Sequence, residues 1–117
     1  MTLRDIRDAL LSVIPNTYHF RAEKQKGPFI VWGETGPANS AYADDMTQIQ
    51  VMNIDVDYFT PHEFDPNFTV LQNLFNGLEL AAWQLNFIRY EDAVYEEGQN
   101  QIHYNWTLEA VLWIAEG

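Results

Sequence analysis

The sequence predicts an α+β protein with a mainly antiparallel sheet of four to five strands and two helices packed on one face. Three observations support this fold class. Segments with the two-residue alternation of a strand outnumber the helical segments, most strands are joined by short turns, and each helical segment has one apolar face. With 117 residues, of which 47% are hydrophobic, the chain is expected to form a single domain over residues 1–117.

The first helix is expected at the N-terminus, where Thr2 and Asp5 resemble a capping box. Apolar residues then follow at helical spacing, at Leu3, Ile6, Leu10 and Val13. Pro15 ends this helix. Residues 17–22 are expected to form a strand and to make a hairpin with residues 29–32, whose continuous apolar run indicates a strand covered on both faces.

Residues 34–45 carry Gly36 and Pro37 and show neither strand nor helix periodicity, so a long loop is expected there. Residues 46–60 form the longest strand pattern so far. In its second half, apolar and polar residues alternate, as in a strand with one buried face. The apolar positions are Met52, Ile54, Val56 and Tyr58, and the polar positions between them are Asn53, Asp55 and Asp57.

Ile49 and Val51 have the opposite parity from the apolar residues that follow them in this strand. Two explanations fit this change. Either a bulge near Val51 reverses the inward face, or the strand continues straight and presents Ile49 and Val51 to a second surface, such as a neighbouring subunit.

The second helix is expected to begin at Asp65 and Pro66, as N-cap and first helical residue, and to end within residues 77–80. Its apolar face consists of Phe68, Leu71, Leu74, Phe75 and Leu78. A strand then runs from Trp83 to Tyr90, and a last strand starts at Gln101. In that last strand, Val111 and Trp113 lie opposite Leu112 and Ile114, which predicts contact with a helix or a partner on the second face.

The charge is strongly uneven along the chain. Residues 1–26 carry five basic and three acidic side chains, whereas the remainder carries only Arg89 against fourteen acids, for a total of −11. Such a surface disfavours DNA binding. It is either a solvated surface that keeps the protein soluble, or the small basic end meets an acidic surface of another copy. On these grounds the candidate interface residues are Arg21, Lys24, Lys26, Tyr42, Asp44, Asp45, Ile49, Val51, Val111 and Trp113.

No motif points to chemistry. The sequence has no GxSxG, P-loop or GxGxxG pattern, no cysteine, and no histidine pair at metal-ligand spacing. Asp55 and Asp57 on one strand face could hold a cation or exchange protons, but the polar half of an alternating strand explains them more simply. We expect no catalytic residue, metal or cofactor, with a metal-dependent enzyme built on this strand as an alternative. The absence of a long apolar run and of a secretory signal predicts a protein that folds in the cytoplasm without a membrane.

The order of these patterns resembles the tail terminator, or tail completion, proteins of long-tailed phages and prophages. The resemblance is carried by PFIVWGE at residues 28–34, a variable loop, IQVMNIDVDYFT at residues 49–60, an Asp-Pro helix and a closing hairpin. It covers nearly the whole chain, although the connecting segments are shorter than in some members of that family.

The resemblance implies a structural virion protein of the phage neck, assembled in the host cytoplasm. It would form a ring, typically a homohexamer, that caps the tail tube, ends tail polymerisation and joins the tail to the head-completion or connector protein. DNA would pass through without specific binding, and an acidic lumen suits this passage. The alternatives are another small neck or minor tail protein, such as a head-closure protein, and a monomeric acidic protein that mimics DNA.

Overall fold

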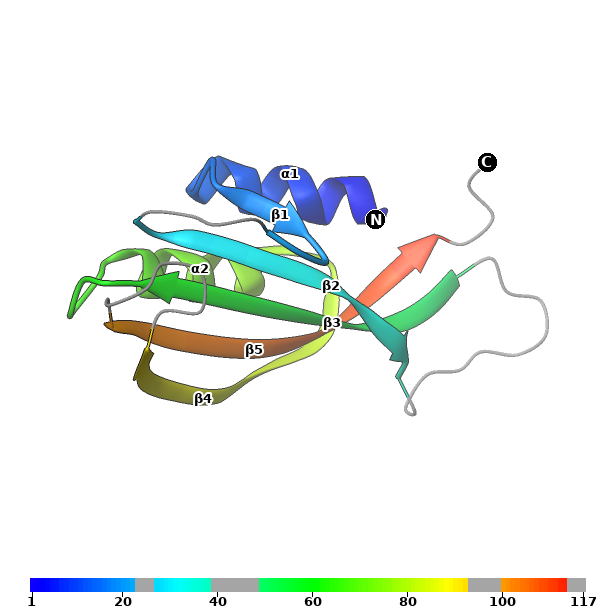
Figure 1. Ribbon diagram of the computed structural model, residues 1–117. Coiled ribbons are helices and arrows are strands. Elements are labelled where there is room, and N and C mark those ends of the chain that lie inside the picture. The colour runs from blue at the N-terminus through cyan, green and yellow to red at the C-terminus, as the bar shows by residue number, and fades with distance from the viewer. Residues whose placement is uncertain (23–26, 39–48, 93–99, 114–117) are drawn as a thin grey trace.

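Five strands form one sheet in the order β1-β2-β3-β5-β4, and two helices lie on one face of it (Figure 1). The computed structural model describes residues 1–22, 27–38, 49–92 and 100–113. Along the chain the elements are α1 (Leu3–Val13), β1 (Thr17–His19), β2 (Phe29–Pro37), β3 (Ile49–Thr60), α2 (Asn67–Gly77), β4 (Leu80–Asp92) and β5 (Asn100–Trp113). All neighbouring strands are antiparallel except β1 and β2, so the predicted α+β class with a mainly antiparallel sheet is confirmed.

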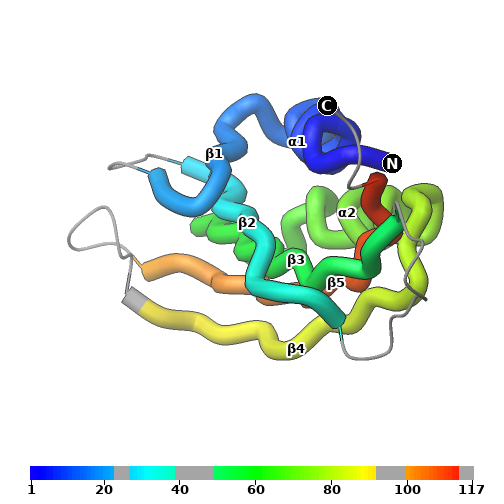
Figure 2. Tube along the Cα trace, turned by 90° about the vertical axis from the view of Figure 1, so that its right-hand side faces the viewer, coloured from blue at the N-terminus to red at the C-terminus, as the bar shows by residue number. Residues whose placement is uncertain are grey.

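The core lies between the two helices and the sheet, which form the two layers seen in Figure 2. α1 begins at the predicted capping box of Thr2 and Asp5. Alternate residues of β3 and β5 meet the apolar faces of both helices there. The fully buried members include Ile6, Leu10, Ile54, Val56, Tyr58, Leu71, Trp106 and Leu108.

α2 begins one residue later than the sequence predicted, with Pro66 and not Asp65 at the N-cap position. The carboxylate of Asp65 accepts a hydrogen bond from the backbone N–H of Asn67 (2.9 Å), and Pro66 at the N-cap position already has helical angles. The helix ends at Gly77, within the predicted range.

The predicted hairpin between residues 17–22 and 29–32 is wrong, because β1 pairs with β2 in parallel, with Thr17 opposite Ile30. β1 ends after three residues, where Phe20 takes a left-handed conformation (φ 70°) and donates its N–H to the carbonyl of Trp32. β1 and β2 therefore run in the same direction and cannot form a hairpin. Residues 29–32 are covered on both faces as predicted, with Ile30 and Trp32 in the main core and Phe29 in a second cluster with Ala22 and Phe59.

The long loop predicted for residues 34–45 is wrong in its first part, because β2 continues through Pro37. A bulge between Glu34 and Gly36 accommodates the irregular composition, and Gly36 supplies the positive φ (140°) that the bulge uses. Residues 39–45 lie outside the described part of the chain.

β3 contains no bulge near Val51. Its pairing with β5 is unbroken from Ile49 opposite Trp113 to Thr60 opposite Ile102, so the strand continues straight, as in the second explanation above. Besides the bulge in β2, the register shifts lie in β4, between Leu80 and Ala82 and between Leu85 and Phe87.

Candidate subunit interface

Four of the candidate interface residues, which lie far apart in the sequence, come together at one end of the sheet. Ile49 is paired directly with Trp113, and Val51 with Val111. All four side chains point to the face that neither helix covers, because their strand neighbours of the other parity belong to the main core. We call these four residues the apolar end patch.

The apolar end patch is accessible to a partner. Trp113 is 49% exposed and Ile49 is 39% exposed, whereas Leu112 on the other face of β5 is buried. Figure 1 shows the start of β3 and the end of β5 extending past the body of the sheet. Exposed apolar side chains that form a contiguous group are typical of interaction surfaces.

The backbone N–H groups at the patch are already used within the chain. Val111 donates to the carbonyl of Glu79 (3.2 Å) and Trp113 donates to the carbonyl of Met1 (3.0 Å). A partner at this end would therefore meet side chains and would not extend the sheet through these two donors.

The middle of the same face carries a network of polar side chains. The ring of His103 on β5 bridges two carboxylates, with Nε2 at 2.7 Å from Asp57 on β3 and Nδ1 at 2.8 Å from Glu91 on β4. Carboxylates accept hydrogen bonds, so the ring makes both contacts when both nitrogens carry a proton. Asn105 donates to the same oxygen of Asp57 (2.7 Å) and accepts from Asn86 (2.7 Å). The network thus ties the three strands β3, β5 and β4 together.

Asp55 also belongs to this network, but its charged carboxylate is less well stabilised there than that of Asp57. Partial burial and the neighbouring charge of Asp57 raise the pKa of the Asp55 carboxyl, and a long hydrogen bond from Thr107 (3.4 Å) opposes this shift. One oxygen of Asp57 is already engaged by two donors. Among the described residues, no group of three His, Asp or Glu side chains is arranged to hold a metal ion. This arrangement supports the explanation that Asp55 and Asp57 are the polar half of an alternating strand.

The other predicted interface residues do not join the apolar end patch. Arg21 is exposed and follows β1, at the edge of the sheet away from β5. The remaining candidates lie outside the described residues: Lys24, Lys26, Tyr42, Asp44 and Asp45.

Sequence reasoning missed the bridging role of His103 and its link to Glu91. The alternation in β5 places His103 on the face of Asn105 and Thr107, and this signal was available in the sequence. Its partners could not be found in the same way, because they depend on which strands are neighbours and on their register.

Comparisons with known proteins do not assign this chain to a family. No family model matches the chain, and no curated protein matches it at a significant level. In the described parts of the chain, neither helix is long and apolar enough to cross a membrane.

Proposed function

We propose that this chain is a structural subunit of a phage tail terminator, which assembles into a ring that caps the tail tube and joins it to the head connector. The observation that carries the proposal is the apolar end patch on the uncovered face of the sheet. Two of its four residues, Ile49 and Val51, lie in the segment IQVMNIDVDYFT, which also carries the family resemblance. A subunit of a ring needs a surface of this kind to contact its neighbour.

The charge of the molecule supports the same role. The total of −11 makes the surface repel nucleic acid phosphates, so DNA can slide through an assembly of such subunits without adhering. On the face of the sheet that neither helix covers, the three carboxylates of Asp55, Asp57 and Glu91 outnumber the basic groups of His103 and Arg89. The protein is proposed to act by assembly and to catalyse no reaction.

The test uses tail tube protein from the phage or prophage that encodes the chain. Wild-type protein should give capped tubes of defined length in electron micrographs, and Trp113→Asp should give uncapped tubes of variable length. Val70→Asp is the matched control, because Val70 is 45% exposed on α2 and lies outside the apolar end patch. Both variants should keep the circular dichroism spectrum of the wild type.

Two outcomes would redirect the proposal. A wild-type chain that binds the head connector but leaves tube length unchanged would indicate a head-closure protein instead. Tight Mg²⁺ binding that disappears in Asp55→Ala, Asp57→Ala protein would revive the metal-dependent enzyme.

A further inference from the structure

The ring of His103 on β5 is fixed between carboxylates of the two neighbouring strands. Nε2 lies 2.7 Å from Asp57 on β3, and Nδ1 lies 2.8 Å from Glu91 on β4. The His103 side chain is only 11% exposed. Its ring stacks on Phe59 with 4.2 Å between the ring centroids, and it meets Phe87 nearly at a right angle, with 5.0 Å between the centroids. These two contacts hold the plane of the imidazole, so both nitrogens stay directed at carboxylates.

This arrangement requires one more proton than a neutral ring supplies. A neutral imidazole has one N–H and one bare nitrogen, which can only accept, and an ionised carboxylate can only accept as well. A bare ring nitrogen at 2.7 or 2.8 Å from a carboxylate oxygen would bring two acceptors together without a hydrogen between them. The charged ring donates to both carboxylates, and such charge-assisted bonds are stronger than neutral ones. The fold therefore favours the charged form of His103.

The charged groups around the ring act in the same direction. Asp55 precedes Asp57 by two residues on the same face of β3, and the charges of the two carboxylates repel. On β4, Arg89 opposes the effect, since it lies 3.7 Å from the second oxygen of Glu91. On β2, the residue opposite Asp57 is the apolar Val31, and the neighbours of the ring along this face of β5 are uncharged. Among the described residues, three carboxylates thus face the ring against one guanidinium, which favours a proton on the ring.

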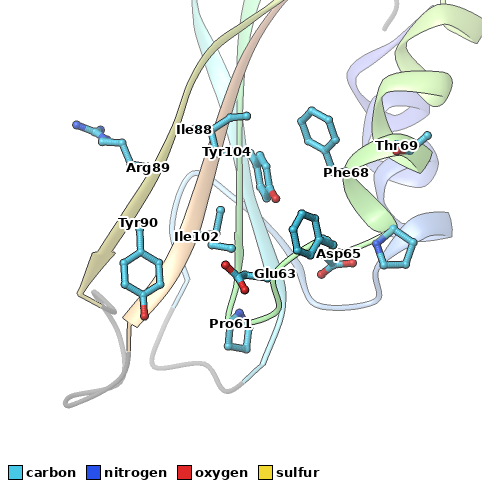
Figure 3. A pocket seen from close by; sticks show the side chains of 12 residues that line it. Pro61, Glu63, Asp65, Phe68, Thr69, Ile88, Arg89, Tyr90, Ile102 and Tyr104 are labelled. Atoms are coloured by element: carbon cyan, nitrogen blue, oxygen red, sulfur yellow. The ribbon is translucent and has the colours of Figure 1, made fainter.

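The strand that Glu91 belongs to forms one wall of a groove. β4 is an outer strand and borders only β5. A groove of about 1040 Å³ lies between the segment that leads into α2 and the strands β4 and β5. Figure 3 shows Ile88 projecting from β4 toward the groove, and Arg89 projecting to the other side of the strand. The backbone pairing of β4 with β5 is irregular between Leu85 and Phe87. The bond between Glu91 and His103 therefore holds this wall from behind, close to the irregular pairing.

We propose that Asp57, His103 and Glu91 form a proton-dependent clamp, which holds β3 and β4 to β5 while the ring is charged and loses one of its two bonds when the ring is neutral. The clamp lies within one chain, so it is independent of the proposed assembly. The folded chain binds this proton more tightly than the unfolded chain, in which the three groups are apart. Stability is therefore lost as the pH rises past about 6.5, where an unperturbed histidine titrates.

The test replaces one carboxylate by a carboxamide, in Glu91→Gln. The glutamine amide can donate to the bare nitrogen of a neutral ring, so both bonds persist without the extra proton. Urea denaturation at about pH 6 and about pH 9 gives the unfolding equilibrium constant of each protein. Between these values, the constant of the wild type should rise at least about threefold more than that of Glu91→Gln. The other histidines and the N-terminus are present in both proteins, so their effects cancel in the comparison.

Two further substitutions serve as controls. In a His103→Gln background, Glu91→Gln should no longer change the pH dependence, because no ring proton is left to lose. Glu34→Gln makes the same chemical change beside His19, whose Nε2 lies 2.6 Å from the Glu34 carboxylate. A neutral His19 can keep that bond by donating from Nε2, so Glu34→Gln should change the pH dependence less than Glu91→Gln does.

Two measurements report on the clamp directly. In nitrogen-15 NMR spectra at about pH 7, the two ring nitrogens of His103 should have nearly equal chemical shifts in the wild type, because both carry a hydrogen. In Glu91→Gln they should be widely separated. Amide hydrogen exchange, corrected for its intrinsic pH dependence, should show that residues 87–91 lose protection between about pH 6 and about pH 9 in the wild type and keep it in Glu91→Gln.

Three results would overturn the clamp. One is an equal pH dependence of wild-type and Glu91→Gln protein. Another is an effect of Glu91→Gln that persists in the His103→Gln background, since the proton would then belong to another group. The third is a wild-type His103 ring with widely separated nitrogen shifts at about pH 7, a result that needs no variant to fold. Tubes that stay uncapped would reject the proposed function and leave all of these measurements unchanged.

Discussion

Asp55 and Asp57 are alternate residues on one face of β3, yet their surroundings give the two carboxylates opposite effects on stability. Asp57 accepts from His103 and Asn105, whereas Asp55 is partly buried beside the charge of Asp57. The raised pKa of Asp55 means that the folded state holds this proton more tightly than the unfolded state does. Stability is therefore lost as pH rises from the unfolded pKa of about 3.9 through the higher folded pKa.

We expect Asp55→Asn to increase the free energy of unfolding at pH 7 by less than about 1 kcal/mol, since the group is partly solvated. The gain should vanish near pH 3, where the carboxyl is neutral in both states. Asp57→Asn is the matched variant and should lower stability at pH 7 by about 1–2 kcal/mol, because it weakens two hydrogen bonds. Urea denaturation at both pH values measures the differences. Equal effects of the two substitutions would contradict this account.

At the scale of elements, the contact between the end of β1 and β2 depends on a missing side chain. A Cβ at Gly33 would lie 2.5 Å from the ring of Phe20, which also stacks on His19. Gly33→Ala should cost about 1 kcal/mol, because the ring must move off the strand. In a Phe20→Ala background the same change should be nearly neutral, so thermal denaturation of the four proteins should show coupling. Additive effects would indicate that the cost comes from the backbone of β2 and not from this contact.

The elements themselves were largely predictable from the sequence. Periodicity located both helices and the alternating strands. The reversed parity of Ile49 and Val51 allowed two explanations, a bulge or a straight strand, and the straight strand is the one that the structure shows. The parallel pairing of β1 was not predictable, because Thr17 and its neighbours carry no signal for the direction of their partner. The extension of β2 was missed because Gly36 and Pro37 usually mark loops, and here they form a bulged strand end.

The candidate site was predictable only in part, because the sequence does not show which elements become neighbours. The apolar end patch could be proposed residue by residue, since parity alone separates Val111 and Trp113 from Leu112. The groove between the segment that leads into α2 and the strands β4 and β5 could not be predicted, because it depends on how far α2 covers these strands. Its one local sign was Phe64, an apolar residue in a turn between Pro61 and Pro66.

At the scale of the whole molecule, two forces could hold copies together: apolar burial, and the attraction between a basic end and an acidic body. Salt screens the second and leaves the first nearly unchanged. We expect the association constant to fall by less than about tenfold between about 0.05 M and 0.5 M NaCl, as measured by light scattering. The charge-reversed variant Arg21→Glu, Lys24→Glu, Lys26→Glu should still assemble. A steep loss in either experiment would show that the basic end carries the contact.

The irregular pairing of β4 has a consequence for how copies of the chain meet at the edge of the sheet. β4 is the outer strand of the sheet, and a regular outer strand is a template on which further strands can add without limit. Its two register shifts and the charged side chains of Arg89 and Glu91 make it a poor template. We therefore expect few contacts between copies to form through the β4 edge.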